Sequence, residues 1–334
     1  MDRLPWGDRL VLFGFLAVVA AVVAAPPLPP AVRVAPLVVS AVVLGLPHGA
    51  VDPVIPWRAA DRWSLPAAAA GVGAVYLVAG GAYALLWFAA PVPAALTFLA
   101  LTWLHWGAGD VAALRARRSD YPASRRHRVL TGAVRGGLPM VVPLVSSPET
   151  YRRVVESWVA LFGADGAVAL AALTAFETRL LAGAALAALT TASLAVGYRA
   201  TGGGPGWRAD AAETTCLWLF FLAVPPLLAV GLYFCLWHSL RHVRRVQALP
   251  AFGPAAGSGS RSGAAAGRAA LRFVRDAAPL TVAALALLAA AWVVVPDSPT
   301  TVGGAVALYL VVVAALTLPH TLVVAWLDRV QAVW

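Results

Sequence analysis

The sequence contains no lysine, only two cysteines and few charged residues, which make up 12% of the chain. Soluble domains typically carry about 25% charged residues, so this composition excludes an ordinary soluble globular protein. Cys216 and Cys235 both lie in apolar sequence without a metal-binding spacing, which excludes a disulfide framework. We expect both to be inert packing residues. Polar and apolar residues do not alternate in the porin manner, which excludes a membrane β-barrel.

Long apolar runs are abundant instead. Hydrophobic residues make up 61% of the chain, the mean hydropathy is +0.80, and several runs approach or reach the roughly 17–25 apolar residues that cross a bilayer. We therefore predict an all-α, polytopic transmembrane helical bundle of about ten spans. The expected spans are residues 10–25, 33–50, 66–89, 94–111, 128–145, 156–175, 179–198, 211–246, 277–295 and 302–327.

Two of these expected spans need a comment. Pro26 and Pro27 directly follow the first span, which favours a retained membrane anchor over a cleaved signal peptide. The segment 211–246 is overlong and interrupted at Pro225 and Pro226, so it is either one broken span or two elements.

The distribution of arginine predicts how the chain is oriented. Six arginines lie between Arg115 and Arg128 and seven between Arg241 and Arg275, whereas residues 89–94 and 296–301 have none. The positive-inside rule then predicts a multi-pass protein of the cell membrane with both termini in the cytoplasm. We expect one transmembrane domain over residues 1–334, with flexible cytoplasmic loops near 112–128 and 248–275. The formal charge of +10 is explained by these loops and lipid headgroups, so no nucleic-acid partner is predicted.

Five histidines interrupt the apolar segments. His238 and His242 are four residues apart, which places two imidazoles on one helix face. In the predicted topology His48, His105 and His320 lie at the same cytoplasmic depth as this pair. Histidines inside a membrane are costly and mark functional sites, so we predict that at least three of them bind a metal or haem. The sixth, His127, is flanked by arginines and is predicted to be a solvated loop residue.

Other polar and aromatic residues leave two interpretations open. Asp52 and Asp110 follow His48 and His105 in the sequence, so each either orients a ligand imidazole or caps a helix end. A buried pair of Arg135 with Glu177 is as well supported as a chemical role for either residue. Four aromatic residues near the histidines either line a substrate channel or anchor the chain at the membrane interface, and general frequencies favour the anchor; they are Trp103, Trp106, Tyr233 and Trp237.

An all-histidine site restricts the chemistry. Neutral imidazoles suit iron, copper, nickel or zinc. Two histidine pairs could instead hold haems for electron transfer, although one predicted span supplies two histidines and the others supply one each. A divalent-metal transporter would need polar residues on both sides of the site, whereas the outer halves of these spans are mostly Ala, Val and Leu. That composition favours a closed apolar chamber.

Four motifs together resemble the Brp/Blh family, the bacterio-opsin-related protein and its homologues, which are membrane β-carotene 15,15′-dioxygenases. They are PHGAVD at 47–52, HWGAGD at 105–110, WHSLRH at 237–242 and PH at 319–320. The resemblance implies that His48, His105, His238 and His242 bind Fe(II). It leaves His320 as a further ligand or site residue of open role, and Trp106 stands where the family pattern has Phe.

The resemblance also implies a function. It predicts iron-dependent oxidative cleavage of β-carotene by O2 at the central 15,15′ double bond, which gives two molecules of all-trans-retinal. The carotenoid would enter laterally from the lipid bilayer, and a rhodopsin-type protein would accept the retinal. The alternatives are a haem- or metal-binding electron-transfer or transport protein, and another carotenoid-modifying activity such as cyclisation.

Overall fold

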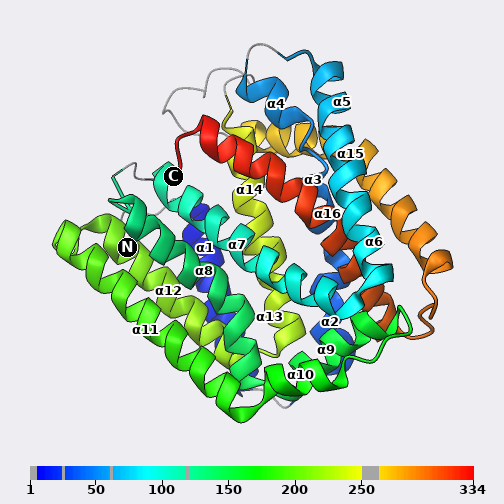
Figure 1. Cartoon of the computed structure of the whole chain (residues 1–334). Coiled ribbons are helices and arrows are strands. Elements are labelled where there is room, and N and C mark those ends of the chain that lie inside the picture. The colour runs from blue at the N-terminus through cyan, green and yellow to red at the C-terminus, as the bar shows by residue number, and fades with distance from the viewer. Residues whose placement is uncertain (1–5, 25–26, 61–62, 118–119, 250–262) are drawn as a thin grey trace.

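The computed structural model describes residues 6–24, 27–60, 63–117, 120–249 and 263–334, and every regular element in these ranges is helical. The predicted all-α class is therefore confirmed (Figure 1). The helices are α1 (Trp6–Ala24), α2 (Pro30–Ser40), α3 (Gly45–Gly49), α4 (Val54–Ala59), α5 (Leu65–Val75), the π-helix η1 (Tyr76–Gly80), α6 (Gly81–Ala89), α7 (Pro91–Arg117), α8 (Arg125–Ser146), α9 (Pro148–Ala160), α10 (Ala167–Thr174), α11 (Phe176–Thr201), α12 (Pro205–Ala223), α13 (Pro226–Leu232), the π-helix η2 (Tyr233–Ser239), α14 (Leu240–Gln247), α15 (Gly263–Val294) and α16 (Val302–Val330).

Six segments among the described residues are long and apolar enough to cross a membrane: Pro30–Gly49, Leu65–Ala89, Arg125–Ser146, Phe176–Thr201, Gly267–Val294 and Val302–Val330. The expected count of about ten spans is not confirmed. The expected span 156–175 is wrong, because α9 ends at Ala160 and α10 has only eight residues. An eight-residue helix is about 12 Å long, which is too short to cross the hydrocarbon core.

The segment 211–246 divides at its proline pair, as one of the two sequence interpretations predicted. Helix α12 ends at Ala223 and α13 begins at Pro226. The expected loops are shorter than predicted, because α7 continues to Arg117 and α15 already begins at Gly263. Residues 118–119 and 250–262, at the centres of those two loops, lie outside the described part of the chain.

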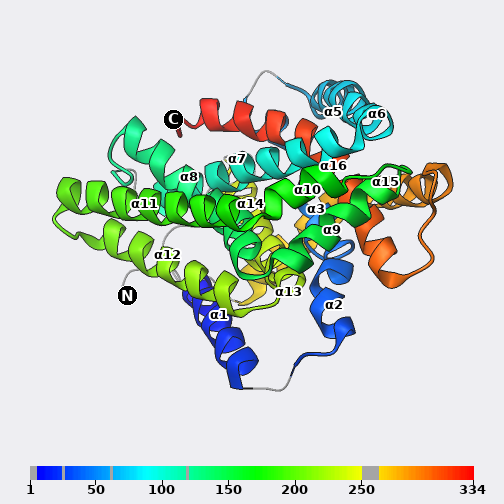
Figure 2. The ribbon, with the colours of Figure 1, turned by 60° about the horizontal axis from the view of Figure 1, so that its bottom comes forward.

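Helices α7, α8, α11 and α12 pack side by side in one half of the molecule (Figures 1 and 2). Glycines permit the close contact between α7 and α8. A Cβ atom on Gly107 would collide with the backbone carbonyl of Gly132, and one on Gly136 would collide with that of Trp103. Only a residue without a side chain fits such backbone contact. The result is a fixed position for the face of α7 that carries His105.

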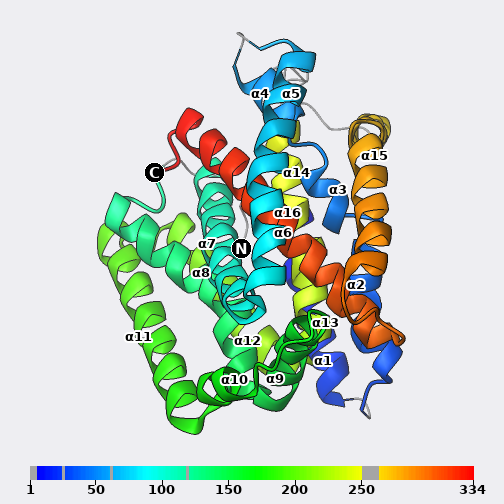
Figure 3. The same ribbon diagram turned by 45° about the vertical axis from the view of Figure 1, so that its right-hand side comes forward.

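Helix α16 crosses the other half of the molecule between α6 and α15 (Figure 3). Pro319 lies inside this helix and removes the amide that would normally bond the carbonyl of Ala315. That carbonyl faces Gly80 of η1, where a Cβ atom would lie 3.3 Å from it. The two elements can therefore approach closely just before His320.

Candidate metal centre

Five histidines from separate elements converge on one point in the bundle. They are His48 of α3, His105 of α7, His238 of η2, His242 of α14 and His320 of α16, and all five are buried. A ring nitrogen of His48, His105, His238 and His320 lies within 4.8 Å of one from each of the other three. His242 forms an overlapping group with Asp52 and His320. The sequence therefore identified all the histidines that the fold brings together.

Local structure explains how His48 and His238 are presented. Nδ1 of His48 donates a hydrogen bond to the carbonyl of Gly45, one turn earlier in α3, so Nε2 has an available lone pair. A Cβ atom on Gly45 would come within 2.8 Å of the Tyr309 hydroxyl. His238 lies in the π-helix η2 and His242 in α14 directly after it. The wider π-helical turn is common at functional sites, and here it ends between the two ligand candidates.

Asp52 orients His320. Its carboxylate oxygens lie 2.9 and 3.0 Å from Nδ1 of His320, and the hydroxyl of Tyr76 donates to the same carboxylate at 2.7 Å. Nδ1 of His320 therefore carries the proton, and Nε2 is buried without a protein partner. A carboxylate behind an imidazole is a recurring arrangement at metal sites. Of the two sequence interpretations of Asp52, the geometry favours orientation of an imidazole.

Two ring nitrogens of the cluster have no hydrogen-bond partner in the protein. Nε2 of His105 and Nε2 of His238 are 3.1 Å apart, whereas Nε2 of His242 and Nε2 of His320 are buried and have no hydrogen-bond partner. Buried polar atoms are costly unless they are paired or bind a ligand. Several imidazoles converging in a dry site match the preferences of iron, copper, nickel and zinc. The residues therefore fit a metal ion.

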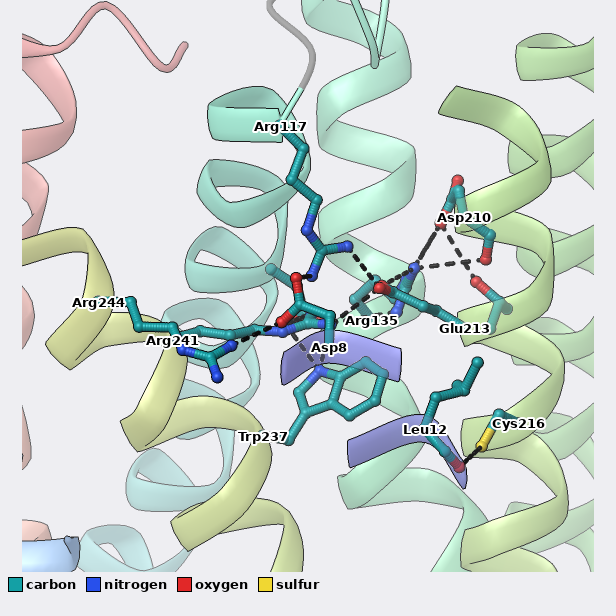
Figure 4. Close-up of polar contacts among 12 residues, drawn as sticks. Asp8, Leu12, Arg117, Arg135, Asp210, Glu213, Cys216, Trp237, Arg241 and Arg244 are labelled. Atoms are coloured by element: carbon teal, nitrogen blue, oxygen red, sulfur yellow. Dashed lines mark hydrogen bonds and ion pairs between the residues drawn. The ribbon is translucent and has the colours of Figure 1, made fainter. Parts of the chain in front are cut away.

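Asp110 belongs to a buried ionic network, in which Figure 4 labels its partners Arg135, Arg241 and Trp237. It pairs with Arg241 at 2.9 Å and with Arg135 at 3.4 Å, and Trp237 Nε1 donates to it at 3.0 Å. Two of these partners, Trp237 and Arg241, are sequence neighbours of His238 and His242. None of the described partners of Asp110 is an imidazole. Asp110 holds α14 against α7, which differs from both roles considered from the sequence.

Arg135 is the centre of this network and is fully buried. It pairs with Asp210 at 2.8 Å and with Glu213 at 3.0 Å, both on α12 (Figure 4). Of the two interpretations left open for Arg135 and Glu177, the buried pair is wrong, because Glu177 is exposed at the start of α11. Sequence reasoning missed these partners because long separations along the chain carry no local signal.

A second ionic contact joins α14 to another histidine-bearing helix. Arg245 Nη2 lies 2.7 Å from Asp328 Oδ1 of α16, eight residues after His320. Arg241 and Arg245 each follow a histidine by three residues, and they join α14 to α7 and α16, respectively. Ion pairs therefore join the helices that carry His105, His242 and His320 to one another.

A cavity of about 700 Å³ lies against the histidines. His48, His105, His238 and His320 line it, and most of its other lining residues are apolar. Residues of α4 and α5 also line it, including Trp57 and Leu65, as do residues of α9 and α13, including Trp158 and Leu227. Figure 3 places α4 and α5 at one end of the molecule, α9 and α13 at the other, and α3, α14 and α16 between them. Helices α3 and α16, which carry His48 and His320, therefore lie between the helices that contribute these other lining residues.

The aromatic candidates separate into different roles. Trp106 lines the cavity, with its ring centre 5.6 Å from that of His238. Trp103, Tyr233 and Trp237 lie outside the lining of this cavity, so the channel interpretation is wrong for them here. The interface-anchor interpretation is also wrong for Trp106, Tyr233 and Trp237, since all three are buried. Trp103 is half-buried and donates to the carbonyl of Ala133 at 2.8 Å.

His127 is not the solvated loop residue that its arginine neighbours suggested. It lies in the first turn of α8 and is fully buried. Its ring and that of Tyr121 lie edge to face, with the ring centres 5.0 Å apart. The adjacent arginines lie in the same first turn of α8. Their charge therefore did not indicate whether His127 itself is buried.

Comparison with known proteins identifies the family of this chain. A family model described as beta-carotene 15,15′-dioxygenase matches residues 39–328. Probable beta-carotene 15,15′-dioxygenase Blh of Halobacterium salinarum is 50% identical over 307 residues, which cover 92% of this chain and 87% of that protein. Probable beta-carotene 15,15′-dioxygenase Brp of the same organism is 33% identical over 268 residues, which cover 78% of this chain and 74% of that protein. No solved structure matches the chain. The chain therefore belongs to the beta-carotene 15,15′-dioxygenase family.

Proposed function

We propose that this protein is a membrane-embedded, non-haem iron dioxygenase that cleaves β-carotene at its central 15,15′ double bond and releases two molecules of all-trans-retinal. One observation carries the proposal: four histidines of the buried cluster line a cavity of about 700 Å³ whose other lining residues are mostly apolar. A long hydrocarbon in this cavity would present an inner bond to the histidines. Depth in the cavity would then select the central bond among many similar ones.

Four histidines, His48, His105, His238 and His242, would hold the iron, with His320 as a further ligand. The orphaned Nε2 atom of His320 and the carboxylate of Asp52 behind it support that fifth assignment. Bound Fe(II) would supply the activation of dioxygen. The chain's own residues would fix the ligand rings, exclude water and hold the polyene.

The reaction balances without a proton donor or acceptor from the protein. The C=C bond of the polyene and the O–O bond of dioxygen break, and two C=O bonds form. We therefore assign no general acid or base, and we assign the ligand histidines as the residues on which the chemistry depends. Substrate would reach the cavity from the lipid bilayer through the side of the bundle lined by α5 and α15, which both have exposed apolar residues such as Leu65 and Leu280. A rhodopsin-type protein is the expected acceptor of retinal.

The direct test is expression in bacteria that accumulate β-carotene, with a His238→Ala variant in parallel. We expect orange pigment to disappear and retinal to form only with the unmodified protein. Unchanged carotene beside folded, iron-loaded protein would reject the proposed reaction. Soret absorbance of the purified protein would support the haem alternative, and metal uptake by vesicles that contain it would support transport. Carotene converted by metal-free protein to a product other than retinal would support cyclisation or a similar modification.

A further inference from the structure

Many threonines on the described helices follow a common pattern that Thr102 and Thr321 break. Of these two, only Thr102 lines the cavity described above. The hydroxyl groups of seven helical threonines donate to the carbonyl four residues earlier; they are Thr97, Thr174, Thr190, Thr191, Thr201, Thr281 and Thr317. Such back-bonding is how a helix normally satisfies a buried threonine. The hydroxyl of Thr102 is buried and makes no hydrogen bond to the protein.

Thr102 also lies close in sequence to a histidine of the cluster. It lies on α7, three residues before His105, and positions three apart share a helix face. Both residues line the cavity, and the side chain of Thr102 is only 6% exposed. The cavity therefore has a hydrogen-bond donor, without a protein partner, next to one of the histidines.

A hydrocarbon substrate offers no acceptor for this hydroxyl. Cleavage changes that, because the C=C and O–O bonds break and two aldehyde oxygens form where the bond lay beside the histidines. A carbonyl oxygen in an apolar cavity is unfavourable unless it accepts a hydrogen bond. We propose that the Thr102 hydroxyl binds an aldehyde product by donating a hydrogen bond to its carbonyl oxygen. This inference rests on the proposed function.

The test is a binding measurement that needs no metal. Metal-free protein in detergent is titrated with all-trans-retinal and with the matching polyene hydrocarbon that has a methyl group in place of the aldehyde. Binding is followed by quenching of tryptophan fluorescence. Thr102→Val keeps the side-chain shape and removes the donor. We expect retinal to bind about 2- to 12-fold more weakly to this variant, the range of one net hydrogen bond, with the hydrocarbon unchanged.

Two variants serve as controls. Thr102→Ser keeps a hydroxyl and should retain most of the retinal affinity. Thr317 lines the same cavity three residues before His320, but its hydroxyl already donates to Val313 at 2.7 Å. Thr317→Val should therefore leave the preference for retinal over the hydrocarbon unchanged.

Three outcomes would overturn the inference: equal weakening of both ligands by Thr102→Val, no weakening of retinal, or an unmodified protein that does not prefer retinal to the hydrocarbon. Cleavage in carotene-accumulating cells separates this failure from that of the proposed function. If the unmodified protein makes retinal and Thr102→Val has unchanged retinal affinity, only the role of Thr102 is rejected. If the unmodified protein leaves carotene intact, the proposed function is rejected first.

Discussion

Asp52 is completely buried and accepts hydrogen bonds from His320 and Tyr76. Removal of a carboxylate behind a metal-ligating imidazole typically costs 10–100-fold in metal affinity. We therefore expect Asp52→Asn to lower the affinity for Fe(II) or its Co(II) substitute by about 10–100-fold. Equilibrium dialysis with metal analysis would measure the loss.

Tyr76→Phe is the matched control, because it removes one hydrogen bond to Asp52 and leaves the carboxylate in contact with His320. Its effect on metal affinity should be clearly smaller. If Asp52→Asn binds metal as tightly as the unmodified protein, His320 is not oriented by this carboxylate for ligation.

At the residue level, the sequence was informative where the residue type itself limits the chemistry. Histidines in apolar segments have few structural explanations, so all five members of the cluster could be identified. Asp52 and Asp110 were indistinguishable in sequence, since both follow a histidine closely. Their different partners are set by tertiary packing. Tyr76 and Thr102 gave no sequence signal, because both are common residues of apolar helices.

Helix α14 shows how an element is positioned by charge. Asp110 pairs with Arg241 of α14 and with Arg135 of α8, and its side chain is only 2% exposed. Removal of one partner from a buried ion pair leaves an uncompensated charge and costs about 3–5 kcal/mol. After Asp110→Asn, Arg135 still pairs with Asp210 and Glu213, and Arg241 still pairs with Glu213. We therefore expect a smaller loss in the free energy of unfolding, about 1.5–3 kcal/mol, which is the contribution of a hydrogen bond to a charged group. Denaturant titration in mixed micelles would measure it.

The exposed pair Arg152 and Glu156 of α9 provides the comparison. Its side chains are 39% and 30% exposed, and exposed pairs contribute at most about 1 kcal/mol. Glu156→Gln should therefore change the free energy of unfolding only slightly. Equal destabilisation by the two variants would show that the Asp110 pairs do not hold α14 in place.

At the level of elements, periodicity and length predicted which segments are helical. They predicted poorly which of these helices are long enough to span the membrane. Residues 156–175 are apolar enough to suggest a span, but the segment turns between α9 and α10. The π-helix at Tyr233–Ser239 has no sequence signature, because it depends on packing around one wide turn. The division at Pro225 and Pro226 was visible because proline restricts the backbone directly.

For the whole molecule, the arginine-rich ends of α7, α8, α14 and α15 predict the orientation in the membrane. We expect both termini and the turn at Asp120 on the cytoplasmic side, and the connection at Ser298 on the outer side. A membrane-impermeant thiol reagent should then label Ser298→Cys in intact cells, and Asp120→Cys only after permeabilisation. Both positions are exposed, and the native cysteines, Cys216 and Cys235, are buried, so background labelling should be low. The reverse pattern would invert the orientation.

Among the described residues, the one arginine that lines the cavity is Arg275 of α15, which is exposed and lies next to Asp276. Arg58 pairs with Asp276 at 3.1 Å. A guanidinium remains protonated in proteins, whereas an aldehyde condenses with an unprotonated amine to form a Schiff base. The described lining of the cavity therefore provides positive charge without an imine-forming nucleophile. Retinal formed beside the histidines could pass Arg275 as the free aldehyde and remain available for covalent capture by a different protein.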